Sequence, residues 1–119
     1  MCKISGIGLD LCGIPRMQRL LDEGRMLRRL FTQAEEDYIR SRGVSAAQSM
    51  AGIYAAKEAV CKAFGTGIAF PLTDIEIAHT ELGQPTVTLH GKAAEFGGAF
   101  MLSITHEDDT AAAMAVWMK

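Results

Sequence analysis

Two oppositely charged residues near the middle of the chain are one helical turn apart. Glu58 and Lys62 are separated by four positions, so in a helix their side chains project from the same face. Such a pair can lie on a surface, where it stabilises a helix by only about 0.2–0.5 kcal/mol. The neighbouring residues are mostly alanine, with valine, cysteine and phenylalanine, which indicates packed surroundings. A carboxylate and an amine in such surroundings could instead bind a metal ion and a phosphate.

Besides Glu58, Asp10 is the carboxylate predicted to lie on a strand or helix among strongly apolar residues. It lies near the end of residues 3–12, KISGIGLDLC, which alternate weakly and include two glycines. This pattern is typical of a strand that another backbone or a ligand approaches closely. One interpretation is that Asp10 caps the following turn. The other is that Asp10 and Glu58 hold Mg²⁺, which keeps several waters and takes further ligands from substrate phosphates, while Lys62 faces those phosphates.

The other candidates for chemistry carry weaker signals. His106 ends a predicted strand at a tight turn, from which a side chain can reach a pocket, although a single histidine there is more often structural. Cys61 has no base near it in the sequence, which favours a buried thiol over a nucleophile. His79 and His90 lie in alternating strands and are predicted to be surface residues. The chain contains no GxGxxG fingerprint, Walker A loop or HExxH motif.

Three helices and four later strands are predicted to position these side chains. The helices span residues 15–22, 32–42 and 46–64, and the strands form two hairpins, 73–79 with 85–91 and 99–106 with 110–118. Thr32 and Glu35 have capping-box spacing, while Ser45 is the predicted N-cap of the long helix and Gly65 its stop. The last two strands are apolar at nearly every position, which predicts a sheet covered on both faces.

Early helices followed by strands predict a single α+β domain over residues 1–119, with a short helix in KAAEFGG. The net charge of −2 argues against general nucleic-acid binding. Cys2, Cys12 and Cys61 are too few and too scattered for a disulfide framework or a cysteine metal site. No apolar run reaches the length of a membrane helix, and Asp10 interrupts any signal-like segment. We therefore expect a cytoplasmic protein.

Arginine is concentrated in one segment of the chain. All seven arginines fall between positions 16 and 42, accompanied by five acidic residues. A charge run of this kind is usually a solvated helical face. It could also form a local basic patch that suits an acidic partner.

Three blocks of the sequence, taken together, resemble a known family. GIGLDL near the start, AAKEAVCKAFGTGI in the middle and LSITHEDDTAAAMAV near the end resemble the holo-acyl-carrier-protein synthases, which are small phosphopantetheinyl transferases. The resemblance covers nearly the whole chain. It implies transfer of 4′-phosphopantetheine from coenzyme A to a serine of apo-acyl carrier protein, with release of adenosine 3′,5′-bisphosphate.

The resemblance also implies roles for individual residues. Asp10 and Glu58 would hold Mg²⁺, with Mn²⁺ as a possible substitute, and Lys62 would contact the phosphates. Arg16 would engage the acidic carrier protein, and Glu58, directly or through water, is the candidate base for the serine. The coenzyme A site would include Lys62, Gly65, Gln84, Pro85, Thr105 and His106. Members are typically homotrimers with active sites between protomers, so self-association would cover the apolar sheet.

One position departs from the family pattern. Ile53 stands where the family usually has an arginine, which would serve the coenzyme A phosphates or the subunit contact. Arg40, Arg42 or Lys92 could substitute for it. Gln84 lies in a turn where the family commonly carries a basic residue, a milder change. The alternative function is therefore a catalytically weakened coenzyme A-binding or regulatory module on the same fold.

Overall fold

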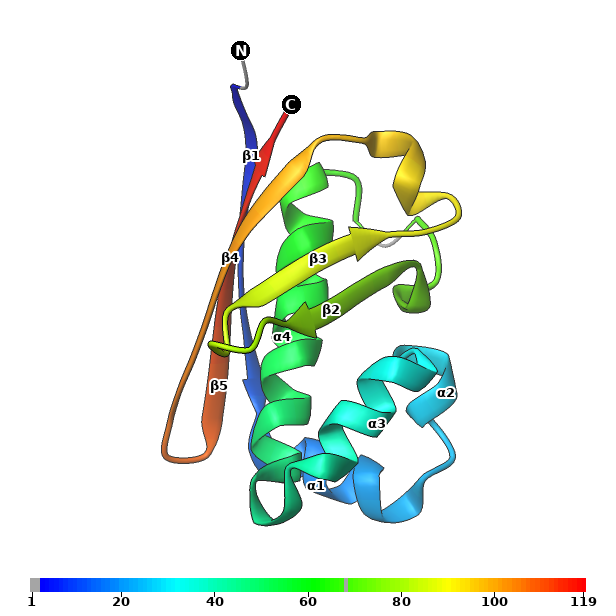
Figure 1. Ribbon diagram of the computed structural model, residues 1–119, viewed down its shortest axis with the longest axis vertical. Coiled ribbons are helices and arrows are strands. Elements are labelled where there is room, and N and C mark those ends of the chain that lie inside the picture. Colours follow the sequence, from blue (N-terminus) through cyan, green and yellow to red (C-terminus); the bar gives the residue numbers. More distant parts are fainter. Residues whose placement is uncertain (1–2, 68) are drawn as a thin grey trace.

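The computed structural model describes residues 3–67 and 69–119. Its long helix α4 (Ala46–Phe64) lies against a three-stranded sheet, and a two-stranded sheet crosses the other side of the helix (Figure 1). The other helices are α1 (Ile14–Glu23), α2 (Leu27–Leu30) and α3 (Gln33–Ser41). The strands are β1 (Ile4–Gly13), β2 (Ile75–His79), β3 (Pro85–Leu89), β4 (Ala99–Glu107) and β5 (Thr110–Met118). This arrangement confirms the predicted α+β class.

The strand order of the larger sheet separates its two edges. The order is β1-β5-β4, with antiparallel pairing between neighbours. Asp10 on β1 lies opposite Ala113 of β5, and His106 on β4 lies opposite Ala111 of β5. The strand nearest the start of the chain therefore pairs with the last strand (Figure 1). Asp10 and His106 consequently lie on opposite edges, with β5 between them.

Small residues allow α4 to lie close to the sheet. The alternate alanines of β5, Ala111, Ala113 and Ala115, are buried, because successive side chains of a strand point to opposite faces. At the end of α4 the ring of Phe64 stacks on Phe96 and meets Trp117 edge-on, with ring centroids 4.1 Å and 5.0 Å apart. The core therefore follows α4 along its length, which makes this helix the frame for any site attached to it.

The sheet exposes apolar side chains on the face away from α4. We call this surface the outer face and define it by Ile7, Leu9, Leu11, Met101 and Met114. Their exposed fractions are 63%, 61%, 68%, 62% and 42%. Within one chain, β4 and β5 are therefore covered on one face only, and the prediction that both faces are covered is not met. The physical reason is that the elements that pack against this sheet lie on the helix side.

Most predicted elements are confirmed, with exceptions at one cap and at the shortest helices. The capping box of Thr32 and Glu35 forms, and Gly65 ends α4 with a left-handed φ of 79°. Ser45 makes no side-chain cap hydrogen bond. The short helices α2 and Leu72–Asp74 were not predicted, because single turns have little periodicity. No helix among the described residues is long and apolar enough to cross a membrane.

An ion pair between Glu35 and Lys57 lies in the core, and both side chains are fully buried. Lys57 Nζ also donates to the carbonyl oxygens of Leu30 and Leu72, at 2.8 Å and 3.0 Å, and Glu35 accepts from the backbone N–H of Ile77 at 2.7 Å. Burial raises the pKa of Glu35 and lowers that of Lys57, and the opposite charge of the partner counteracts each shift. The sequence predicted only the capping role of Glu35.

Candidate active site

Lys62 contacts Asp10 rather than its helical neighbour Glu58. Its Nζ donates to Asp10 Oδ1 and to the carbonyl oxygen of Leu9, both at 3.0 Å. Asp10 does not cap the following helix, because Gly13 is the N-cap of α1 and no side chain caps it. The alternatives of a capping aspartate and of a plain Glu–Lys surface pair are therefore both wrong. Two of the three residues predicted for chemistry, Asp10 on β1 and Lys62 on α4, are therefore in direct contact.

Glu58, the third predicted residue, lies in the same locality. Burial raises the pKa of the Cys12 thiol, Arg16 lowers it, and the charges of Asp10 and Glu58 raise it further. Both carboxylates are therefore close enough to one thiol to affect its ionisation. Glu58 is half-buried and Asp10 has 17% of its side chain exposed. Asp10 on β1 and Glu58 on α4 therefore lie in the same part of the molecule, and Lys62 contacts the first of them.

Tyr54 is a member of this group that the sequence analysis missed. The guanidinium carbon of Arg16 lies 5.4 Å from the centre of the Tyr54 ring. Burial raises the pKa of Tyr54, the charge of Glu58 raises it further, and the charge of Arg16 lowers it. Tyr54 therefore connects Arg16 on α1 with the carboxylate one helical turn further along α4. Its spacing of four residues from Glu58 was the available signal.

The donor set at this site can be compared with what a metal ion needs. Asp10 and Glu58 provide two carboxylates, and no group of three or more His, Cys, Asp or Glu side chains suited to a metal occurs within residues 3–67 and 69–119. Structural and catalytic zinc sites normally take three or four protein ligands. Mg²⁺ usually takes one or two carboxylates and keeps water or phosphate oxygens as its other ligands. The residues present therefore fit Mg²⁺, or the similar Mn²⁺, rather than zinc.

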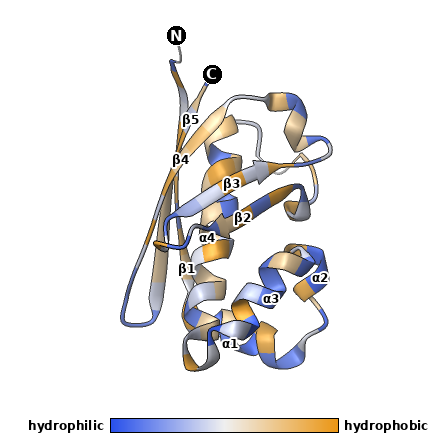
Figure 2. Ribbon diagram, in the orientation of Figure 1, coloured by the Kyte–Doolittle hydropathy of each residue, from blue (hydrophilic) through white to orange (hydrophobic). Residues whose placement is uncertain are grey.

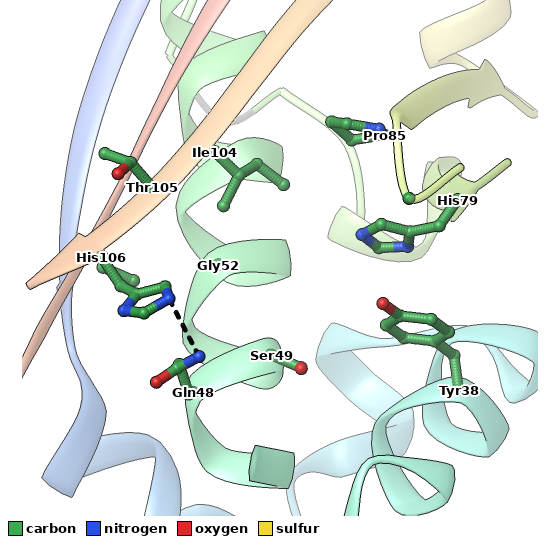
Figure 3. A pocket seen from close by; sticks show the side chains of 11 residues that line it. Tyr38, Gln48, Ser49, Gly52, His79, Pro85, Ile104, Thr105 and His106 are labelled. Carbon is green, nitrogen blue, oxygen red and sulfur yellow. Dashed lines mark hydrogen bonds between the residues drawn. The ribbon is translucent and has the colours of Figure 1, made fainter. Parts of the chain in front are cut away.

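A cavity of about 190 Å³ lies on the other side of α4, near β4 (Figure 3). Three residues of the predicted coenzyme A set, Pro85, Thr105 and His106, line it. Nε2 of His106 lies 3.1 Å from Nε2 of Gln48, and Figure 3 shows these two side chains directed toward each other. Gln84 does not line this cavity but lies in a neighbouring groove between β3 and β4, which Pro85 also lines.

The opposite wall of the cavity is aromatic. The rings of Tyr38 and His79 stack with centroids 4.2 Å apart and planes 7° apart, and the Arg42 guanidinium carbon lies 5.7 Å from the centre of the Tyr38 ring. Burial and the charge of Arg42 lower the pKa of His79. The prediction that His79 is a surface residue is met only in part, because its side chain is partly exposed while Tyr38 of α3 stacks on its ring. His90 is exposed as predicted and contacts Glu76 at 3.0 Å.

The predicted site residues thus form two groups rather than one. Asp10, Glu58 and Lys62 lie at the β1 edge, whereas Thr105 and His106 lie at the β4 edge. Gly65 follows the last turn of α4 and does not line the cavity. The residues that sequence similarity assigns to one reaction are therefore divided within a single chain.

The position that departs from the family pattern is not near the surface. Ile53 has only 1% of its surface exposed and belongs to the core. Of the three basic residues that could compensate, Arg40 pairs with Glu36 at 3.1 Å. Lys92 lies in a different hollow, with Phe70 and Phe96. Only Arg42 stands next to the cavity wall, over Tyr38.

Comparison with known proteins identifies a family to which the sequence of this chain is similar. Residues 6–115 match the family model of the 4′-phosphopantetheinyl transferase superfamily. The chain is 41% identical over 119 residues to a holo-[acyl-carrier-protein] synthase of Treponema denticola, covering 95% of this chain and 97% of that relative. An enzyme of the same name from Clostridium perfringens is 41% identical over 124 residues, covering 95% of this chain and 92% of that relative.

Solved structures agree with the sequence comparisons. The crystal structure of the holo-[acyl-carrier-protein] synthase from Neisseria meningitidis has a TM-score of 0.84 and 34% identity, covering 98% of this chain and 100% of that one. The Bacillus anthracis enzyme, in complex with coenzyme A (3′,5′-ADP), has a TM-score of 0.82 and 32% identity, covering 98% and 97%. A Helicobacter pylori enzyme in complex with coenzyme A has a TM-score of 0.80 and 27% identity, covering 93% and 98%.

Proposed function

This chain belongs to the 4′-phosphopantetheinyl transferase superfamily, and we propose that it acts as a holo-acyl-carrier-protein synthase. It transfers 4′-phosphopantetheine from coenzyme A to a serine of apo-acyl carrier protein and releases adenosine 3′,5′-bisphosphate. The observation that carries this function is the contact between Asp10 of β1 and Lys62 of α4, one helical turn from Glu58, in a chain similar over nearly its full length to enzymes of that name. We propose that it works in the cytoplasm.

The chemistry requires one bond to form and one to break at phosphorus. The serine oxygen attacks the phosphorus bonded to pantetheine, and the bond from that phosphorus to the bridging oxygen breaks, so that the bridging oxygen leaves with adenosine 3′,5′-bisphosphate. Asp10 and Glu58 hold Mg²⁺ or Mn²⁺ in this proposal. When bound, a divalent cation supplies positive charge beside the diphosphate as its leaving oxygen becomes negative.

The protein residues have separate tasks in this reaction. The side chain of Lys62 is 55% exposed, so it can turn from Asp10 to the diphosphate without opening the core. Glu58, directly or through water, accepts the proton of the attacking serine. Asp10 on β1 acts mainly as an electrostatic anchor.

The coenzyme A nucleotide occupies the β4 side in this proposal. Thr105, His106 and Pro85 already line the cavity there, and Gln84 lies beside it. Arg42 takes the place of the arginine that Ile53 replaces, because it is the compensating candidate beside this cavity. Gly65 contributes at the end of α4, on the side of Lys62.

A complete site therefore needs a second copy of the chain. We place the β1 edge of one protomer against the β4 edge of its neighbour, in a closed homotrimer. Two observations support this assembly: the division of the site residues between opposite edges, and the exposed outer face, which association would bury. Interfaces of this head-to-tail kind generate rings when the rotation closes.

The acidic carrier protein docks on the arginine-rich segment in this proposal. α2 and α3 present hydrophilic residues (Figure 2), and Arg16 on α1 stacks on Tyr54 beside Glu58. Exchanging Arg16 for glutamate should weaken carrier-protein binding far more than coenzyme A binding. Titration of each ligand by calorimetry would test this, and equal effects on both would contradict it.

The transfer reaction itself is the deciding experiment. Coenzyme A, apo-acyl carrier protein and Mg²⁺ should give a mass increase on the carrier serine, and omission of the divalent metal should abolish it. Glu58→Gln and Asp10→Ala should each lower the rate by about 100-fold or more. Glu95→Gln, at an exposed position of the short helix Ala93–Phe96, should not. Calorimetric binding of coenzyme A without any transfer would instead support the coenzyme A-binding or regulatory module that the Ile53 position made conceivable.

A further inference from the structure

The two glycines of β1 lie directly on the backbone of α4. A Cβ atom at Gly8 would lie 1.8 Å from the carbonyl oxygen of Ala59, and one at Gly6 would lie 1.9 Å from that of Ala63. Cβ atoms essentially never approach other heavy atoms closer than 3.0 Å. The obstructing atoms belong to a helix backbone, which cannot rotate aside as a flexible side chain can. The absence of a side chain therefore sets how closely β1 approaches α4.

A polar contact holds the strand and the helix together at the next residues. Lys62 Nζ binds the carbonyl oxygen of Leu9 and the carboxylate of Asp10, both at 3.0 Å. Leu9 and Asp10 follow Gly8 directly, and Lys62 lies between Ala59 and Ala63. The backbone contact and the polar contact thus fix the same short length of β1 on α4.

We propose that Gly8, assisted by Gly6, is a positioning residue for the metal site. Its missing side chain sets the spacing between Asp10 on β1 and Glu58 on α4 at which both carboxylates can share one divalent cation. The inference rests on the proposed function, in which these two residues hold Mg²⁺. That ion demands ligand distances of about 2.0–2.1 Å in near-octahedral geometry, so a small displacement of the strand is enough to lose one ligand.

The substitution Gly8→Ala tests this inference without altering either carboxylate. Mn²⁺ binding, measured by electron paramagnetic resonance in the presence of coenzyme A, should weaken by about 10- to 100-fold, the range seen when the groups that orient metal ligands are changed. Circular dichroism should show that the variant remains folded. A folded variant that binds Mn²⁺ as tightly as the unchanged protein would overturn the proposal.

Gly13→Ala provides the matched control on the same strand. A Cβ atom there would meet nothing within 4 Å, and the φ of −72° is accessible to alanine. This variant should bind Mn²⁺ like the unchanged protein. An equal loss of Mn²⁺ binding in Gly13→Ala would show that glycine replacement in β1 acts generally, and would also overturn the proposal.

A second substitution makes the test depend on spacing rather than on stability. Asp10→Glu adds one methylene, so alone it should weaken Mn²⁺ binding, whereas in the Gly8→Ala background it should restore part of the lost affinity. Additive losses would contradict the spacing argument. Should Gly8→Ala not fold, Asp10→Glu alone carries the test, because it changes the ligand spacing without adding an atom between β1 and α4. Mn²⁺ binding by Asp10→Glu as tight as that of the unchanged protein would then overturn the proposal. Failure of the unchanged protein to bind Mn²⁺ would overturn the proposed metal site itself, and this inference with it.

Discussion

Two lysines on α4, five positions apart, have opposite surroundings. The Lys57 side chain is 0% exposed and the Lys62 side chain is 55% exposed. Lys57 is held by Glu35 and by two backbone carbonyl oxygens, so its charge is fully committed to the core. Lys62 pairs with Asp10 at the surface, so its amine can leave this carboxylate for another anionic group. At the scale of single residues, the lysine side chain therefore supports the fold at position 57 and belongs to the proposed site at position 62.

Replacing Lys57 with methionine should destabilise the protein by about 3–5 kcal/mol, because Glu35 would remain buried without its partner. The double variant Lys57→Met with Glu35→Gln should recover part of that loss. Lys62→Met is the matched control, since it should change stability little while abolishing transfer. Urea denaturation measures the first effect, and similar stability losses for Lys57→Met and Lys62→Met would contradict this assignment.

Cys61 should be unreactive in the folded protein. Burial, with the charge of Glu58 as the second cause, raises its pKa to about 11, and the thiolate is the reactive form. Iodoacetamide near the ordinary thiol pKa of about 8.5 should leave Cys61 unmodified in the native state and modify it in denaturant. Peptide mass mapping distinguishes the two, and rapid native modification would show that this thiol is accessible.

The β2–β3 hairpin is attached to α3 through two glutamates. Glu76 on β2 accepts a hydrogen bond from the Thr32 hydroxyl at 2.6 Å, and Glu35 on α3 accepts from the N–H of Ile77. Thr32 is also the N-cap of α3, so the hairpin binds the residue that starts the helix. The attachment places His79 on Tyr38 and thereby forms the aromatic wall of the cavity. At the scale of elements, the cavity depends on how α3 docks on the hairpin.

This attachment should weaken in acid. The Thr32 hydrogen bond, with His90 as the next cause, holds the pKa of Glu76 below its ordinary value of 4.5. A depressed native pKa contributes stability that is present above the unfolded pKa and is lost as the pH falls through the native pKa. Glu76→Gln should therefore be less stable than the unchanged protein at neutral pH, and the difference should disappear in acid.

Urea denaturation from about pH 7 to about pH 3 would follow that difference. Glu81→Gln, in the exposed turn of the same hairpin, should leave the pH profile unchanged. A constant gap between Glu76→Gln and the unchanged protein over the whole range would show that ionisation of Glu76 does not contribute.

At the scale of the whole molecule, one chain holds the proposed site residues at two separate edges and leaves one face of the larger sheet uncovered. The carboxylates lie at the β1 edge and His106 lies at the β4 edge. The outer face exposes large apolar side chains on all three strands, although α4 covers the opposite face. The homotrimer that we propose would bring the two groups of residues together and would also cover this face.

A charge at the centre of the outer face should therefore prevent both assembly and transfer. Met114→Glu, on the middle strand, should give a folded monomer, whereas the unchanged protein should have the mass of a trimer by light scattering. Val44→Glu is the matched control, because Val44 is fully exposed in the turn before α4, and it should remain trimeric and active. A monomeric unchanged protein that transfers at full rate would contradict the shared-site model.

Local patterns in the sequence determined most of the secondary structure and the choice of candidate carboxylates. Periodicity and caps located three helices and both hairpins, because these signals act between residues a few positions apart. The apolar surroundings of Asp10 and Glu58 selected the carboxylates for which we propose metal binding. The glycines before Asp10 correctly predicted a close approach of another backbone, which is that of α4.

Tertiary packing decided which residues that lie far apart in the sequence come into contact. Glu35 with Lys57, Tyr38 with His79 and Arg16 with Tyr54 each join different elements, and no local spacing encodes these contacts. Strand order also required the structure, because residues on two predicted strands can share an edge or lie on opposite edges with the same sequence pattern. The sequence therefore determined which residues are available for chemistry, and the packing of β1 and β4 on either side of β5 decided that one chain holds them in two separate groups.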